Sequence, residues 1–249
     1  MTVYPFLGLG FNSWTQKFGR EVTQEEEEGG GGGDSFVAVN KIVVGKPLGN
    51  QLSNFIRPGS AYVYNLDGTG EVMLTSSDAV DLDRFGQSVG LGTNRIAVGA
   101  PNADPSGFSS GKVYLYNLSG TQVGIITASD GAGGDNFGYS VAIGNNKIVV
   151  GAYDDDDTAS NTGSVYVYNL DGTGEVKINA SDAASFDRFG DVVAVGSNRI
   201  VVGAHNDDDD GSESGAVYVY NLDGTNEVKI TASDAASGDE FGYAVSRGS

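Results

Sequence analysis

The sequence predicts an all-β protein built from about four repeats of one four-stranded antiparallel unit, each repeat being 52 residues long. Several unrelated markers recur at this one spacing, which is the signature of a repeat architecture. The markers are Phe-Gly at Phe85, Phe137, Phe189 and Phe241, and Tyr-x-Tyr at Tyr62, Tyr114, Tyr166 and Tyr218. We therefore expect repeats at residues 33–84, 85–136, 137–188 and 189–240, with the start of a fifth at 241–249.

Within a repeat, short segments rich in Val, Ile and Tyr are bounded by Gly, Asn or Asp, a pattern typical of strands joined by turns. In the third repeat the expected strands are residues 137–144, 147–152, 164–170 and 175–180. Asn145 and Asn146 favour a tight hairpin between the first two strands, and Asp171-Gly172 favours one between the last two. Each repeat is thus expected to be a four-stranded meander.

Both faces of these strands are apolar, which indicates how the meanders pack. In the third strand Val165 and Val167 lie on one side, and Tyr166 and Tyr168 lie on the other. A sheet with one solvated face would alternate polar and apolar residues. Sheets packed between identical sheets around an axis form a β-propeller, with small residues such as Gly151 where backbones approach closely.

The run FGYSVAIGNNKIVVGA, followed by GSVYVY, resembles the FG-GAP repeat, and the resemblance extends over residues 34–249. That family includes the β-propeller of integrin α chains and many bacterial and phage surface proteins, so the resemblance implies a β-propeller. In the integrin repeats a calcium loop lies between the first two strands. Here that turn has only two or three residues, so integrin-type calcium coordination does not carry over. The first repeat lacks Phe-Gly, and we expect residues 241–245 to pair with it and close the ring.

The net charge of −19, from 14 basic and 33 acidic residues, argues against nucleic acid and anionic membranes as partners. No apolar run approaches the roughly 18 residues of a membrane span, so we expect no membrane insertion. The N-terminus has no basic segment ahead of its short apolar stretch, and we do not expect a secretory signal.

Residues 1–33 differ from the repeats and are expected to form an extended N-terminal segment with a Glu/Gly-rich tether at residues 24–34. One interpretation is a frayed terminus. The other is an anchoring peptide that docks in a partner through four aromatic residues, namely Tyr4, Phe6, Phe11 and Trp14.

Two loops between second and third strands concentrate carboxylates, which are ligands for hard cations such as Ca²⁺. The candidate metal ligands are Asp154, Asp155, Asp156, Asp157, Asp207, Asp208, Asp209 and Asp210. The alternative is a solvated acidic rim, because neither run has the spacing of an EF-hand loop. A pair of aspartates also recurs in every repeat, for example Asp130 with Asp135, and we expect it to satisfy backbone N–H groups; a cation site is the alternative.

The sequence favours a protein that is not an enzyme. The spacing places no nucleophile within hydrogen-bond reach of the single histidine, His205, and the runs of aspartates lie in polar loops, which would not raise the pKa of a carboxyl as a glycosidase acid requires. From the resemblance we expect a structural or adhesive protein of a bacteriophage virion, tail-associated or capsid-decorating and assembled in the host cytoplasm. Its expected partners are other virion proteins, bound through the N-terminal segment, and a host-surface glycan or protein. A homo-oligomer would form if blade edges stay open. The alternative is a secreted or cell-surface bacterial module for calcium-dependent adhesion.

Overall fold

The computed structural model describes residues 40–48, 58–78 and 80–247 of the chain. By its internal contacts the chain divides into two units, Met1–Phe36 and Val37–Ser249, and every described residue belongs to the second. The expected N-terminal segment, its tether and the anchoring residues Tyr4, Phe6, Phe11 and Trp14 therefore lie outside the described residues.

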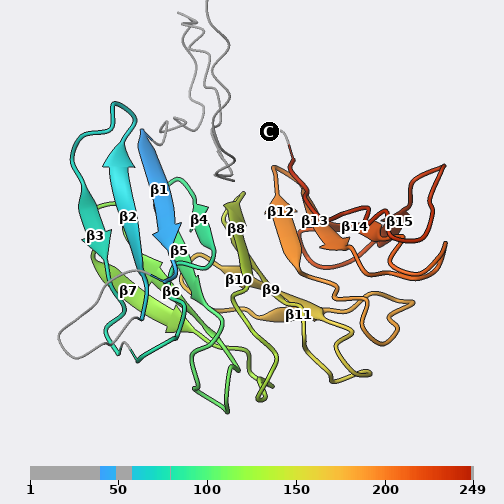
Figure 1. Ribbon diagram of the computed structural model, residues 1–249. Helices are drawn as coiled ribbons and strands as arrows, with labels where there is room; N and C mark the ends of the chain where they lie inside the picture. Colours follow the sequence, from blue (N-terminus) through green and yellow to red (C-terminus); the bar gives the residue numbers. More distant parts are fainter. Residues whose placement is uncertain (1–39, 49–57, 79, 248–249) are drawn as a thin grey trace, which may run out of the picture. The chain divides into compact units, whose positions relative to one another are not determined.

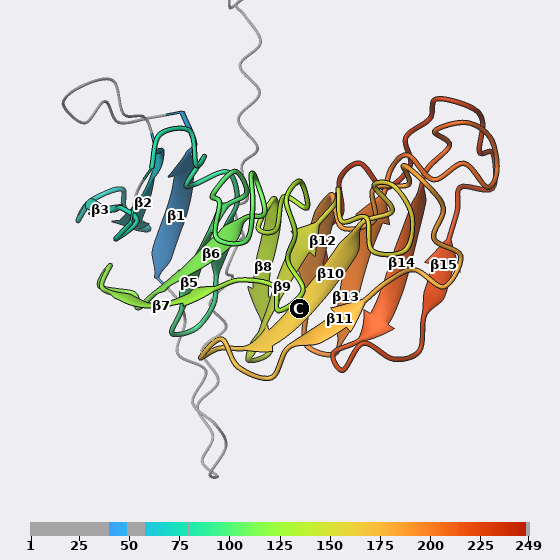
Figure 2. The same cartoon turned by 90° about the horizontal axis from the view of Figure 1, so that it is seen from below.

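The second unit is all-β in its described part and consists of four antiparallel sheets that follow one another in chain order (Figures 1 and 2). The first sheet contains β1 (Lys41–Lys46), β2 (Ser60–Asn65) and β3 (Val72–Leu74). The second contains β4 (Val89–Leu91), β5 (Ile96–Ala100), β6 (Lys112–Tyr116) and β7 (Gln122–Ile126). The third contains β8 (Ser140–Gly144), β9 (Lys147–Ala152), β10 (Ser164–Asn169) and β11 (Val176–Ile178). The fourth contains β12 (Val192–Val195), β13 (Arg199–Ala204), β14 (Ala216–Asn221) and β15 (Val228–Ile230). The predicted fold class of an all-β repeat propeller is confirmed.

Local sequence chemistry explains the turns of each meander. Asn145 and Asn146 join β8 to β9 with φ angles of 43° and 58°, the left-handed conformation that a two-residue hairpin needs. Between β10 and β11 the Asp171 carboxylate accepts hydrogen bonds from the backbone N–H and the hydroxyl of Thr173. The sheets thus have the strand order of the chain, as a meander requires.

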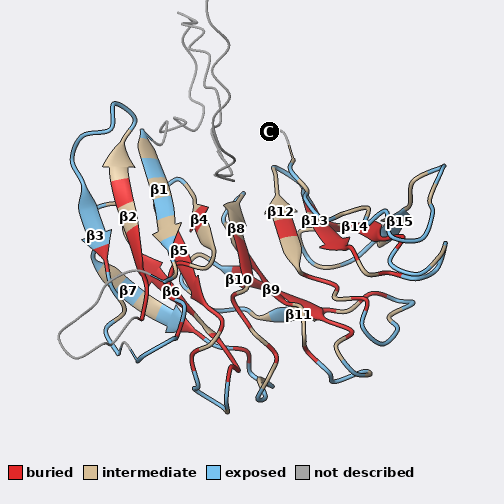
Figure 3. Cartoon of the chain, in the orientation of Figure 1, coloured by how far each residue is buried: buried red, intermediate tan, exposed pale blue. Residues whose placement is uncertain are grey.

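The second and third sheets each pack one face on the sheet before and the other face on the sheet after. In the third sheet Val165 and Val167 join the core shared with the fourth sheet, whereas Tyr166 and Tyr168 join the core shared with the second. The inner strands of the two middle sheets, β5, β6, β9 and β10, are consequently buried on both faces, whereas β7 and β11 at the outer edge are partly exposed (Figure 3). The apolar residues on the two sides of these strands form these two cores, as the sequence predicted.

The repeated Phe-Gly pair packs at the interface between each sheet and the next. Phe137 is fully buried and lies edge-on to the rings of Tyr166 and Tyr168, with centroid separations of 5.3 and 6.2 Å. A Cβ at Gly151 would collide with the carbonyl oxygen of Gly190 at the start of the next sheet. Glycine is therefore required where the two backbones meet.

The expected pairing of residues 241–245 with the first sheet is wrong. This segment lies against the fourth sheet, where the Phe241 N–H donates to the Ser214 carbonyl and Arg247 donates to Ser197 and Asn198. Every other Phe-Gly segment packs in the same way on the sheet that precedes it in the chain, as Phe189 does on the third sheet. Residues 241–247 follow this repeat and do not pair with the first sheet.

Within the described residues, no helix is long and apolar enough to cross a membrane.

Candidate functional site

The candidate site is one end of the sheets, where the loops from the second to the third strand meet the segments that connect successive sheets. We call it the acidic rim and define it as residues 127–139, 153–163, 179–191 and 205–215. The tight hairpins of each meander lie at the opposite end of the strands, because neighbouring strands run antiparallel. The meander topology thus gathers loops far apart in the sequence on one rim.

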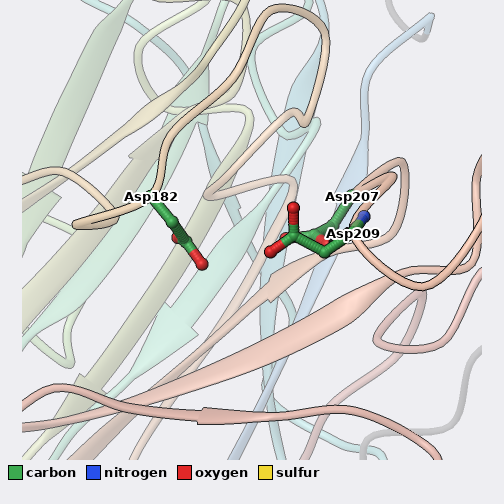
Figure 4. Close-up of side chains that lie close together, drawn as sticks. All are labelled: Asp182, Asp207 and Asp209. Atoms are coloured by element: carbon green, nitrogen blue, oxygen red, sulfur yellow. Dashed lines mark hydrogen bonds between the residues drawn. The ribbon is translucent and has the colours of Figure 1, made fainter.

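A lysine lies at the centre of the carboxylates in the fourth sheet. The Lys229 ammonium is 2.8 Å from Asp182, 2.8 Å from Asp207 and 2.6 Å from Asp209. Figure 4 shows these three carboxylates, which come from the connecting segment and from the loop after β13. The β15 strand thus supplies a cation to acidic groups from two other segments.

The third sheet repeats this arrangement with a different set of residues. The Lys177 ammonium is 2.8 Å from Asp130, 3.0 Å from Asp155 and 2.6 Å from Asp157. The second sheet has a simpler version, in which Lys112 pairs with Asp78. The cluster of one lysine and three aspartates therefore belongs to the two repeats that carry the four-aspartate runs.

A buried tyrosine of the sheet donates hydrogen bonds to carboxylates of each cluster. The Tyr218 hydroxyl lies 2.8 Å from both the Asp182 and the Asp207 carboxylates. Burial raises the pKa of Tyr218, and the two carboxylates raise it further. Burial alone would lower the pKa of Lys229, but the three carboxylates outweigh it and raise that pKa. For Asp182 the burial penalty is likewise outweighed, by the bonds from Lys229 and Tyr218, and its pKa falls. These shifts favour the charged forms of Lys229 and Asp182 and the neutral hydroxyl of Tyr218.

The carboxylates of Asp182, Asp207 and Asp209 lie within 4.8 Å of one another, close enough to share one cation. The Lys229 ammonium already fills that role, with all three oxygens at hydrogen-bond distance. A divalent ion does not fit this arrangement unless Lys229 withdraws, because both cations would need the same oxygens. Calcium binding on these loops stays a prediction.

The structure divides each run of four aspartates among several roles. Asp155, Asp157, Asp207 and Asp209 face the lysines. Asp154 accepts from the side chains of Asn136 and Asn161, and Asp208 accepts the backbone N–H of Glu213. Asp156 and Asp210 are exposed and have no hydrogen bond to any described residue. Adjacent carboxylates point in different directions, so they do not converge on one ion.

Of the two recurring aspartates of each connecting segment, the second has the structural role expected from the sequence, whereas the first, such as Asp182, accepts from a tyrosine and a lysine instead. Asp135 accepts the backbone N–H of Ala132 at 2.6 Å, and Asp187 accepts that of Ala184 at 2.7 Å. Burial raises the pKa of each of these two carboxyls to about 6, against the lowering effect of the backbone hydrogen bond. Asp83 and Asp239 make the same bond in their repeats.

His205 is not part of a catalytic triad in the described structure. Its Nδ1 lies 3.2 Å from the Asp191 carboxylate, and its ring lies edge-on to Tyr243 at 5.2 Å. Among the described residues no serine is hydrogen-bonded to His205.

Sequence reasoning missed Lys177 and Lys229, each of which pairs with three carboxylates of its cluster. It also missed Phe108, which is 81% exposed in the loop after β5. A signal for the lysines was present: Val-Lys-Ile recurs at the 52-residue period, and Ser-Asp follows three residues later. Lysine alternates with apolar residues in that strand, so it must lie on the tyrosine side.

A family model described as "FG-GAP repeat" matches residues 69–116, 121–168, 173–220 and 225–248, together well over half of the chain. The first three matches each begin before the last strand of one sheet and end at the third strand of the next. A search of curated proteins found no match.

Proposed function

The chain belongs to the FG-GAP repeat family, and from this we propose that it is a non-enzymatic, structural or adhesive β-propeller that presents its acidic rim to a partner. One observation carries the proposal: each inner carboxylate cluster is bonded to its own lysine, whereas other carboxylates of the same loops face solvent. The inner clusters stabilise the loops, and the outer carboxylates are free for contacts. Recognition groups are commonly carried on loops that a rigid scaffold positions.

The exposed groups suggest what the rim would contact. Asp156, Asp208 and Asp210 are exposed around the third and fourth sheets, and Phe108 adds an exposed aromatic ring beside the segment at residues 132–134. Carboxylates accept hydrogen bonds from hydroxyl groups and pair with cations, and aromatic rings stack on sugars and apolar side chains. This chemistry supports a surface glycan or protein as the partner.

We place the protein on a bacteriophage virion, as a tail-associated or capsid-decorating protein that binds other virion proteins through its N-terminal segment. The support is the resemblance of its near-identical repeats to phage members of the family. Deletion of residues 1–20 is expected to abolish incorporation into particles while the far-ultraviolet circular dichroism stays that of a β protein. Normal incorporation of the deleted chain would contradict the anchor.

The alternative is a cell-surface bacterial module for calcium-dependent adhesion. It is favoured by the grouping of Asp182, Asp207 and Asp209 within cation-sharing distance. This alternative requires calcium to displace Lys229, so it predicts that a chelator lowers both adhesion and the melting temperature.

The rim can be tested with two variants of equal charge change. The rim variant carries Asp156→Asn, Asp208→Asn and Asp210→Asn, and the control carries Asp67→Asn, Asp171→Asn and Asp223→Asn in the hairpins at the opposite end. Asparagine keeps an acceptor oxygen for the backbone bonds that Asp208 and the hairpin aspartates accept. We expect binding to host envelope material to weaken in the rim variant and to be unchanged in the control. Equal binding by the rim variant and the unmodified protein would refute a role for these carboxylates.

A further inference from the structure

The first sheet has an uncovered face whose equivalents are buried in every other sheet. Ile42 is 37% exposed and Val44 is 46% exposed, although Ile148 and Val150, at the same positions of the third sheet, are fully buried. The equivalence follows from Gly45, whose Cβ would meet the carbonyl oxygen of Gly86 as that of Gly151 would meet Gly190. This face is the one that carries the tyrosines, and within the described residues nothing covers it.

The fourth sheet has the complementary face uncovered. Ile230 is 43% exposed, whereas its equivalents Ile178 and Ile126 are 5% and 4% exposed because the next sheet packs on them. Val201 and Val219 are half-buried, although Val149 is fully buried by the following sheet. The two uncovered faces are therefore the two halves of the contact that recurs three times inside the chain.

The partners of a recurring aromatic contact are also divided between the first and the fourth sheet. At each internal interface a Phe-Gly phenylalanine lies edge-on to two tyrosines, as Phe189 does to Tyr218 and Tyr220. Phe241 occupies the same place on the fourth sheet, but it is half-buried and touches no described tyrosine ring. In the first sheet Tyr62 and Tyr64 stack on each other at 6.4 Å without a described phenylalanine against them.

The polar groups are divided in the same way. Asp234 is exposed and has no hydrogen bond to any described residue, although its equivalent Asp182 accepts from Tyr218 and pairs with Lys229. On the first sheet the Lys46 ammonium lies 6.0 Å from the centroid of Tyr62, much as Lys229 lies 5.3 Å from that of Tyr218. The first sheet thus carries a tyrosine and a lysine that can donate hydrogen bonds, and the segment after the fourth sheet carries the aspartate that would accept them.

We propose that a second copy of this chain docks its first sheet on the fourth sheet of the first copy, head to tail, and so continues the row of sheets. In this contact Phe241 packs against Tyr62 and Tyr64 of the other copy, and Asp234 faces Tyr62 and Lys46. The apolar groups around Ile230 cover those around Ile42. Because different surfaces meet, the contact is heterologous and produces either a closed ring or an open row of copies.

The test is the mass of the full chain in solution, measured by sedimentation velocity and light scattering. We expect a multiple of the 25.7 kDa monomer that dissociates on dilution. Ile42→Asp and Ile230→Asp each place a charge in the contact and are expected to weaken self-association by roughly a hundredfold. Both positions are exposed in the monomer, so the fold should tolerate these substitutions. Val123→Asp, at a position 49% exposed on β7, is the matched control and should associate normally.

Mixing the two variants distinguishes a head-to-tail contact from a symmetric one. Each variant keeps one intact face, so an equimolar mixture of Ile42→Asp and Ile230→Asp chains should form pairs of one copy each and nothing larger. A charge exchange gives a second test: Lys46→Glu and Asp234→Lys should each weaken association, and the chain carrying both should regain it.

Three results would overturn the proposal. The first is a monomer at every concentration, as expected if residues 1–36 or the first and fourth sheets of the same chain cover these faces. The second is a multimer that neither aspartate variant weakens. The third is a mixture of the two variants that stays monomeric although the unmodified chain associates.

Discussion

Replacing Lys229 with methionine tests whether the lysine stabilises the three carboxylates that surround it. The side chain packs with 21% exposure and bonds three carboxylates, and methionine keeps its length without its charge. We expect the loss to be largest at Asp207, because its side chain is 3% exposed and keeps only neutral donors, the hydroxyl of Tyr218 and the backbone N–H of Asp209. Asp182 and Asp209 are 36% and 61% exposed, so water can replace the lysine there.

The expected loss of stability follows from this difference in exposure. Removing one partner of a fully buried ion pair costs about 3–5 kcal/mol, and rehydration of the two exposed carboxylates reduces this to about 2–3 kcal/mol. For a chain of this size that loss corresponds to a fall in melting temperature of roughly 4–12 °C. Lys112→Met, which removes a lysine bonded to Asp78 and no other described carboxylate, is the control and should cost less.

Calcium adds a second readout to the same variant. In the unmodified protein Lys229 competes for the three carboxylates, so adding calcium or a chelator should leave the melting temperature unchanged. The Lys229→Met chain has three carboxylates within 4.8 Å and no ammonium competing for them, so calcium should raise its melting temperature. Scanning calorimetry with and without calcium measures both. The reasoning fails if the variant is as stable as the unmodified protein, or if a chelator destabilises the unmodified protein as strongly as the substitution does.

Two further predictions concern packing and pH. Gly151→Ala places a methyl group against the Gly190 carbonyl and should cost about 1–3 kcal/mol in chemical denaturation. Gly124→Ala meets only the Leu115 side chain at 3.8 Å and should be neutral or slightly stabilising, so an equal loss in both would contradict the backbone contact. The pKa values of Asp135 and Asp187, raised to about 6, mean that the folded protein takes up protons before the unfolded chain does. Stability should therefore rise as pH falls from 7 through 6 towards 4, by on the order of 2 kcal/mol for each group, and then fall as the lysine-bound carboxylates, whose pKa values are lowered, become protonated. Asp135→Asn with Asp187→Asn should flatten the rise in a series of denaturation curves, and an unchanged rise would show that other groups cause it.

The sequence alone determined the repeat and the strands within it, because both depend on local chemistry that recurs every 52 residues. The paired asparagines at 145 and 146 specify a hairpin wherever they occur, and apolar residues on both sides of β9 and β10 require burial on both faces. The backbone role of Asp135 was likewise readable, because its partner lies three residues away.

Only the tertiary structure decided what the remaining acidic residues do. Lys229, Asp182 and Asp209 belong to three separate segments, and the packing of those segments determines which carboxylates share a cation. The destination of residues 241–247 was also undecidable from the sequence, because the Phe-Gly segment can pack on any sheet that ends in the same apolar face. A local sequence pattern determines which kind of surface a segment can pack on. Because that surface recurs in every repeat, the arrangement of all the sheets determines which of the repeats the segment packs on.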